Sequence, residues 1–286
     1  MGKCVVLINK IAGGYSGAGE AKRIARLKEM YSEVEVAYIP GTVPDFSGAE
    51  AIVVQGGDGT LNHLINSEVP NNASVYYLPG GTLNEVAHAR GNAPISVVSE
   101  GGGKLFSYVL AAGTFTPLGY IADVGSKQRL KVFAYIFKVL KEYKVWRMRA
   151  EITADGKTNA GEYTLIMAIN SPRCFGFNFN RLYTDGGKMC LLTIKAPKAR
   201  GLLGKIAIFF PFFRAFFIGF NREYSSETMT FKPFDKLSLK FESVPVFCAD
   251  GEKVDDMPHE FDINKKSLSY KIRIGFPEKD KKIDRR

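Results

Sequence analysis

The spacing of hydrophobic residues changes near residue 118 and divides the chain into two kinds of sequence. Before that point, short β-rich apolar runs alternate with stretches of helical spacing. The apolar runs are residues 4–8, 34–38, 51–55 and 75–78, and the clearest helical pattern covers 21–31. This alternation predicts a parallel sheet flanked by helices, as in a Rossmann-like nucleotide-binding domain.

Beyond residue 118, apolar residues recur at every second position. The pattern is clearest at residues 148–152, 237–241 and 268–274, and it predicts half-buried antiparallel strands. Helical spacing returns only at 131–143 and 202–220. The second half of the chain is therefore expected to be an antiparallel β-sandwich.

A domain boundary is expected where Pro117 and Gly119 interrupt both patterns. The 286 residues suffice for two domains of ordinary size. The fold class predicted is α/β, with a Rossmann-like nucleotide-binding domain at 1–118 followed by an antiparallel β-sandwich domain at 119–286. The prediction leaves open that residues at the C-terminal end belong to the first domain.

We expect a cytoplasmic protein with an anionic partner. A net charge of +10 favours either a nucleic acid or an acidic membrane surface. The densest basic stretch, 127–149, contains no aromatic platform or recognition motif, so we expect no nucleic-acid partner. No run resembles a signal peptide. The four cysteines show neither zinc-site spacing nor a compact disulfide framework, and we expect reduced thiols at Cys4, Cys174, Cys190 and Cys248.

The most specific motif is GGDGT at residues 56–60, between an apolar strand and a helical pattern. Its glycines are expected to take positive φ and to bring backbone N–H groups close to a phosphate, and the helix N-terminus adds further donors. A carboxylate among such donors implies Mg²⁺, or proton transfer from an attacking hydroxyl, so Asp58 is a candidate catalytic residue. The alternative is a tight turn in which Asp58 or Thr60 caps a helix.

Two further glycine loops follow predicted strands. One has the sequence NKIAGG at residues 9–14, and the other has PGGTLNE at residues 79–85. Three loops at the carboxyl ends of neighbouring strands would form the crevice in which open α/β sheets bind nucleotides. None of the three is a Walker A loop or a dinucleotide fingerprint.

These loops, together with the DGE sequence at residues 250–252, resemble in order the motifs of the diacylglycerol kinase and sphingosine kinase superfamily, and the match spans nearly the whole chain. The chain is similar to the bacterial soluble lipid kinases. The resemblance implies a lipid kinase that uses ATP and Mg²⁺ to phosphorylate the hydroxyl of a membrane lipid such as diacylglycerol. It also implies an active site in the cleft between the two domains and suggests a homodimer, peripherally attached to an anionic membrane.

The resemblance assigns roles to individual residues. It makes Glu252 the general base, beside Asp58 as the second catalytic residue. It puts a structural magnesium site at Leu182, Asp185 and Gly187, partly on backbone carbonyls. The ATP contacts that it implies are Asn9, Lys10, Ile11, Ala12, Gly13, Thr42, Gly56, Gly57, Asp58, Gly59, Thr60, Leu61, Asn62 and Thr82.

Departures from the family pattern keep two other functions open. Lys10 stands where the family usually has proline, and Glu85 replaces an aspartate. An NAD kinase-like phosphotransferase shares the GGDGT turn, although the PGGT context of Asn84 matches the lipid kinases. A catalytically impaired nucleotide-binding regulator is the other alternative, because Glu85 moves a carboxylate by about 1.5 Å in a network that tolerates about 0.5 Å.

The apolar run at 201–220 has two interpretations. It contains seven phenylalanines but also Lys205, Pro211 and Arg214, and it is too interrupted for a transmembrane helix. It is either a buried core helix or an element that enters the membrane interface.

Overall fold

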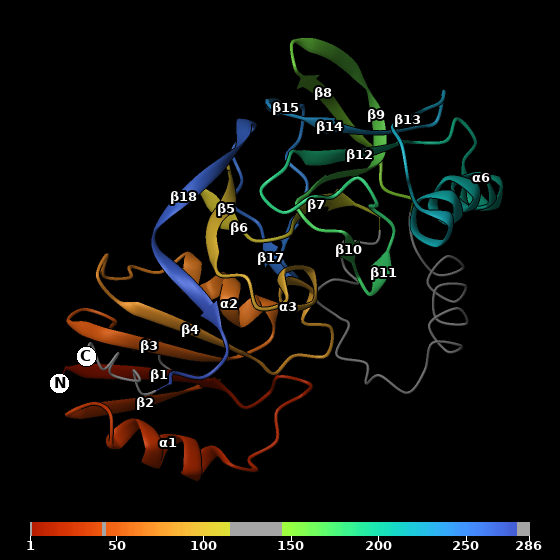
Figure 1. Ribbon diagram of the computed structural model, residues 1–286. Coiled ribbons are helices and arrows are strands. Elements are labelled where there is room, and N and C mark those ends of the chain that lie inside the picture. The colour runs from red at the N-terminus through yellow and green to blue at the C-terminus, as the bar shows by residue number, and fades with distance from the viewer. Residues whose placement is uncertain (1, 42–43, 115–144, 279–286) are drawn as a thin grey trace. The chain divides into compact units, whose positions relative to one another are not determined.

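The computed structural model describes residues 2–41, 44–114 and 145–278, which form two compact units (Figure 1). The first unit comprises Met1–Ser96 and Leu268–Arg286, and the second comprises Val97–Ser267. The first unit is built on a parallel sheet and the second on antiparallel strands, so the predicted α/β fold class is confirmed.

The sheet of the first unit has the strand order β18-β4-β3-β1-β2, with every neighbouring pair parallel. The central strands are almost completely buried, because both faces of such a sheet are covered and the strands read as continuous apolar runs. The strands are β1 (Lys3–Asn9), β2 (Glu33–Ile39), β3 (Ala49–Gly56), β4 (Ser74–Pro79) and the end of β18 (Glu260–Ile274).

Three helices cover this sheet. Helix α1 (Glu20–Lys28) lies on one face, and α2 (Asp58–Ile65) and α3 (Glu85–Arg90) lie on the other (Figure 1). Leu27 of α1 packs against apolar residues of β1 and β3, and this contact anchors the helix. Helix α2 begins two residues after β3 ends, and α3 begins six residues after β4 ends, so each helix follows the glycine turn that leaves its strand.

The second unit encloses its own apolar core. Strand β9 bends, so that its first half pairs with β8 and its second half with β7, while β12 lies along its other edge. The strand order is β13-β14-β12-β9-β8-β15-β18. The strands are β5 (Ile95–Gly101), β6 (Lys104–Phe106), β7 (Val109–Gly113), β8 (Met148–Ala154), β9 (Lys157–Ile169), β10 (Arg173–Cys174), β11 (Phe177–Asn178), β12 (Met189–Lys195), β13 (Tyr224–Ser225), β14 (Met229–Phe234), β15 (Leu237–Phe241), β16 (Phe247–Ala249) and β17 (Glu252–Val254).

The division between the units differs from the boundary predicted at residue 118. Strand β7 pairs antiparallel with β9 and β16, so residues 97–114 belong with the second unit. Every residue of β7 is buried, and an uninterrupted apolar run has no period that would distinguish an antiparallel strand from a parallel one. At the other end, β18 pairs in parallel with β4 and brings Leu268–Arg286 into the first unit.

The cysteine prediction is confirmed, because all four cysteines are buried and free. Burial raises the pKa of Cys4 and of Cys248 to about 12, which keeps both thiols protonated. The predicted helix at 131–143 and most of the basic stretch at 127–149 lie outside the described residues.

Candidate nucleotide-binding and catalytic site

The three glycine loops meet at the carboxyl edge of the parallel sheet. Strands β1, β3 and β4 are neighbours in that sheet, so the loops that leave them start side by side. The Gly14 N–H donates to the carbonyl of Gly80 (2.9 Å), and the Gly80 N–H donates to the carbonyl of Gly56 (2.7 Å). Backbone hydrogen bonds therefore tie all three loops into one structure.

Glycine is required here by close approach and not by backbone conformation. A Cβ on Gly81 would lie 2.5 Å from the Cα of Gly57, and one on Gly14 would lie 2.8 Å from the Gly80 carbonyl oxygen. The expectation of positive φ in the GGDGT turn is wrong, since Gly57 has φ −83° and neither Gly56 nor Gly59 is among the glycines with positive φ. The missing side chains let the loops touch.

Gly81→Ala is expected to push the loop at 79–85 away from the GGDGT loop at 56–60. Overpacking of this kind costs roughly 1–3 kcal/mol, and each kcal/mol lowers Tm by about 2–4 °C. Affinity for ATP should fall as well. Thermal melts and a nucleotide titration measure both effects, with Gly17→Ala as the control, because a Cβ at Gly17 meets only the Tyr15 hydroxyl at an ordinary 3.6 Å. Equal behaviour of the two variants would contradict the prediction.

Side-chain amides hold the loops in shape. Asn9 Nδ2 donates to Thr60 Oγ1 (2.9 Å), and Asn9 Oδ1 accepts from the Ile11 N–H (3.0 Å). Asn84 has a left-handed backbone with φ 46°, and its amide both accepts from and donates to the backbone of Gly81. Asn9, which was predicted as an ATP contact, therefore shapes the loop.

Asp58 is buried and caps a helix other than its own. Its Oδ2 accepts from the Glu85 N–H (2.7 Å) and its Oδ1 from the Val86 N–H (3.2 Å), so the carboxylate satisfies the start of α3. A carboxylate offers about four lone-pair positions, and these bonds use two of them. Asp58 thus serves as a cap and still fits a single position in the coordination shell of Mg²⁺.

The other predicted ATP contacts are distributed around the same edge. Lys10, Ile11, Ala12 and Gly13 follow β1, and Thr82 follows β4. Asn62 is buried on α2, and Leu61 is fully buried with its N–H bonded to the Gly57 carbonyl, so that N–H is already committed within the helix. The N–H groups of Asp58, Gly59 and Thr60 belong to the first turn of α2, where no intrahelical acceptor is available. Thr42 lies outside the described residues.

A polar cluster beside the 9–14 loop joins Lys10 to Tyr15, Glu20 and Tyr38, which were not in the predicted site. Lys10 Nζ lies 3.6 Å from the centroid of the Tyr38 ring, and the hydroxyls of Tyr15 and Tyr38 donate to the Glu20 carboxylate (2.7 and 3.0 Å). The bond from Tyr15 lowers the pKa of Glu20 and raises the pKa of Tyr15 itself. Of these residues only Lys10 was a predicted contact, and the parallel pairing of β1 with β2 brings Tyr38 beside the end of β1.

The DGE turn contains one buried residue with a structural role, Asp250, and one exposed residue, Glu252. The Asp250 carboxylate is 1% exposed and accepts from the backbone N–H groups of Ser107, Tyr108 (2.9 Å) and Val109 (3.0 Å). It therefore holds the start of β7 against β16. Glu252, the predicted general base, is the first residue of β17 and is exposed. A proton acceptor must reach its substrate, so exposure suits Glu252 better than Asp250.

The residues of the predicted structural magnesium site, Leu182, Asp185 and Gly187, lie in one loop of the second unit. The Gly187 N–H closes a turn on the Thr184 carbonyl (2.9 Å), and Asp185 Oδ1 accepts from the Tyr183 hydroxyl (3.3 Å). The cation that contacts the Gly187 carbonyl is the Lys265 ammonium. Nowhere in residues 2–41, 44–114 and 145–278 do three His, Cys, Asp or Glu side chains gather as metal ligands.

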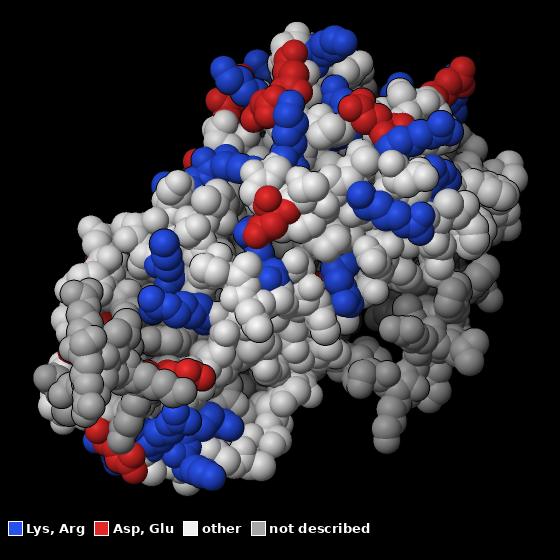
Figure 2. Space-filling view, viewed as in Figure 1, with Lys and Arg blue, Asp and Glu red and all other residues white. Residues whose placement is uncertain are grey.

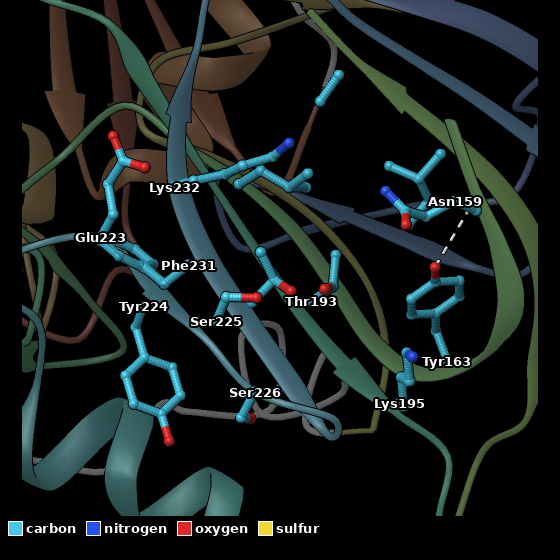
Figure 3. A pocket seen from close by; sticks show the side chains of 14 residues that line it. Asn159, Tyr163, Thr193, Lys195, Glu223, Tyr224, Ser225, Ser226, Phe231 and Lys232 are labelled. Carbon is cyan, nitrogen blue, oxygen red and sulfur yellow. Dashed lines mark hydrogen bonds between the residues drawn. The ribbon is translucent and has the colours of Figure 1, made fainter. Parts of the chain in front are cut away.

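A pocket of about 430 Å³ in the second unit contains none of the predicted site residues (Figure 3). Strands β8, β9, β12, β13 and β14 form it, and the Tyr163 hydroxyl donates to the Asn159 carbonyl (3.3 Å) at its wall. Lys195, Lys232 and Glu223 bring charge to its lining. The lining is therefore polar and charged as well as apolar.

Sequence comparisons point to one family. Residues 3–100 match the model of the diacylglycerol kinase catalytic domain. The diacylglycerol kinase of Bacillus subtilis is 28% identical over 147 residues, which cover 45% of this chain and 48% of that protein. The diacylglycerol kinase of Staphylococcus saprophyticus is 29% identical over 138 residues, or 41% of this chain and 45% of the relative. The chain thus spans about half the length of the curated relatives it matches.

Solved structures share the fold over nearly the whole chain. The crystal structure of a diacylglycerol kinase from Bacillus anthracis superimposes with a TM-score of 0.63 at 17% identity, covering 95% of this chain and 96% of that one. An NAD kinase from Archaeoglobus fulgidus in complex with ATP gives a TM-score of 0.50 at 12% identity, covering 95% and 93%. These likenesses concern the fold alone. The sequence match therefore carries the comparison, and the resemblance of the glycine motifs is confirmed: residues 3–100 are similar to the diacylglycerol kinase catalytic domain.

Proposed function

We propose that this chain is an ATP-dependent lipid kinase that transfers the γ-phosphate of ATP to the hydroxyl of a lipid such as diacylglycerol. The observation that carries the proposal is the set of three glycine loops joined by backbone hydrogen bonds at the carboxyl edge of the parallel sheet, inside the matched segment 3–100. Ligands of open α/β sheets bind at this edge. The names of the relatives supply the lipid class.

The loops have the properties that polyphosphate binding requires. Backbone N–H groups of the loops and of the first turn of α2 present donors, and Lys10 adds a cation beside the first loop. Asp58 would hold Mg²⁺ through a carboxylate oxygen. The ion, when bound, would neutralise charge on the transferring phosphate, which is the main demand of phosphoryl transfer.

The proposed reaction forms one bond and breaks one bond. The lipid hydroxyl oxygen attacks the γ-phosphorus, the bond from that phosphorus to the β–γ bridging oxygen breaks, and ADP leaves. The hydroxyl proton passes to the Glu252 carboxylate. A modest base suffices because the hydroxyl becomes acidic only as it attacks.

An acceptor screen tests the proposal. The purified chain is incubated with γ-labelled ATP, Mg²⁺ and one of four additions: diacylglycerol in mixed micelles, a sphingoid base, NAD or buffer. Labelled lipid with diacylglycerol is expected. Labelled NADP would favour the NAD kinase-like alternative, and ATP binding without transfer to any acceptor would favour a catalytically impaired regulator, as the Glu85 replacement allows.

We also propose that the protein docks peripherally on an anionic membrane through one face of α6 (Gly201–Phe213) and η1 (Arg214–Ile218). Opposite faces of this 18-residue helix differ. Residues 204, 208, 212 and 215 are buried. The other face exposes Leu202 (72%), Leu203 (70%), Ile206 (50%), Phe210 (67%), Phe213 (41%) and Ile218 (50%).

Charge around this helix suits an anionic surface. Residues 196–220, which comprise this helix and the segment leading into it, contain no Asp or Glu. They include the cations Lys198, Arg200, Lys205 and Arg214. In Figure 2 the surface over α6 is white with Lys and Arg beside it. By length and composition alone the helix could cross a membrane, but its packed face and flanking cations are typical of a helix lying in the interface. The expected homodimer and cytoplasmic location remain predictions.

Replacing Phe210 and Phe213 together with serine is expected to weaken binding to anionic vesicles by roughly 10- to 100-fold, because each exposed ring would lose its burial in lipid. Phosphorylation of a water-soluble short-chain acceptor should change little. Vesicle sedimentation measures the first effect. Phe212 is 5% exposed, so Phe212→Ser is the matched control and should lower Tm. Unchanged sedimentation of the folded double variant would sink the membrane proposal.

A further inference from the structure

The loop at residues 182–187 has a lysine ammonium where the family resemblance implies magnesium. Lys265 Nζ donates hydrogen bonds to the carbonyl oxygens of Gly186 (3.0 Å) and Gly187. The Gly187 carbonyl is one of the oxygens expected to bind the metal. Lys265 comes from β18, which is distant in sequence, so the contact joins that strand to the loop.

The ligand set around this loop is poor for Mg²⁺. That ion demands nearly octahedral oxygen coordination and is usually held by one or two carboxylates. Here Asp185 is the only carboxylate of the loop, and its Oδ1 accepts from the Tyr183 hydroxyl. An ammonium already within hydrogen-bonding distance of the carbonyls would repel a divalent cation at the same oxygens.

The ammonium meets the same needs that a metal would. It carries positive charge and three N–H donors, and it has no acceptor, so it satisfies carbonyl oxygens pointing into a turn. The rest of the loop is shaped by its own bonds. Leu182 N–H donates to Asn180 Oδ1 (3.2 Å), and the buried Asn180 amide donates to the Ser171 carbonyl (2.9 Å).

We propose that in this chain the Lys265 ammonium replaces the structural magnesium ion, so that the 182–187 loop is ordered without a divalent cation. The built-in cation links β18 to the segment that leads into β12. The loop would then keep its shape at any magnesium concentration. A metal dependence of catalysis would arise elsewhere, from the ATP-bound ion.

Thermal melts without nucleotide test this proposal on the full chain. Wild-type Tm should be the same in excess EDTA and in millimolar MgCl₂. Lys265→Met keeps the length of the side chain but removes its charge and donors, and should lower Tm by about 2–4 °C and speed amide exchange at Gly187. Lys265→Arg keeps the charge and the donors, so it should retain the wild-type Tm and the wild-type amide exchange at Gly187. Lys266→Met removes a neighbouring exposed lysine and should behave as wild type.

Two results would overturn the proposal. One is a wild-type Tm that rises with Mg²⁺ when Asp185→Asn abolishes the rise, because the loop would then hold a metal. The other is Lys265→Met matching Lys266→Met in both Tm and Gly187 exchange. No substrate is used in these measurements, so failure here is distinguishable from failure of the lipid kinase proposal.

Discussion

Glu252→Gln is expected to lower kcat by roughly 10²- to 10⁴-fold, the contribution typical of a general base. Glutamine keeps the size of the side chain at the start of β17 but cannot accept the proton of the attacking hydroxyl. The KM for ATP should change little. Because Glu252 is exposed, its substitution should leave Tm unchanged, and steady-state kinetics at saturating ATP and lipid measure the loss directly.

Two controls make this result specific. Glu227→Gln removes another exposed carboxylate from the second unit and should leave kcat at the wild-type value. Asp250 lies two residues before Glu252, and Asp250→Ala should instead lower the stability of the fold. It leaves three buried N–H groups without their acceptor, which costs about 3 kcal/mol of folding stability or more. A folded Glu252→Gln variant with normal kcat would remove Glu252 from the mechanism.

Asp58→Asn is expected to lower Mg²⁺-dependent phosphoryl transfer by roughly 10²- to 10⁴-fold, since a metal ion supplies several kcal/mol of charge stabilisation. The structure adds a cost to stability that the motif did not reveal. Asparagine has one side-chain acceptor, so its oxygen can serve the N–H of Glu85 or of Val86, while its NH₂ group faces the other. That mismatch should cost about 1–3 kcal/mol.

The two effects of Asp58→Asn are measured separately. Kinetics across a MgCl₂ titration report the metal role, and a thermal melt reports the cap of α3. Asp45→Asn is the control, because the exposed Asp45 carboxylate also accepts a backbone N–H, from Ser47 (2.8 Å), away from the glycine loops. A lower Tm with normal turnover would make Asp58 a helix cap only.

Glu85 illustrates the limit of arguing from a motif. The sequence marks it as a departure from the family aspartate, with a displaced carboxylate. In the structure the side chain is fully buried at the start of α3, and its backbone N–H is the group that Asp58 holds. The backbone contact is the same for either residue. The length of the Glu85 side chain therefore bears on the packing beneath the loop more directly than on the Asp58 contact.

Local sequence by itself determined the strands, the first helix and the glycine loops of the first unit. Apolar runs such as 4–8 and 51–55 predict buried parallel strands, and β1 and β3 are found there. The DG pair at 155–156 predicts a hairpin turn, and Asp155 and Gly156 have positive φ between β8 and β9. These features depend on neighbouring residues, so spacing and turn chemistry suffice to predict them.

The tertiary structure decided which partners those elements meet. Period-two spacing predicts the last strand but not that β18 pairs with β15 through one part and with β4 through another. Helical spacing at 202–220 likewise did not decide between a core helix and a surface helix. In the structure this helix has one buried face and one exposed face. Lys265 meets the 182–187 loop, and Asp58 meets the start of α3, across sequence separations that no local pattern encodes. Periodicity specifies which face of an element is apolar, whereas the partner of that face depends on how the whole chain packs.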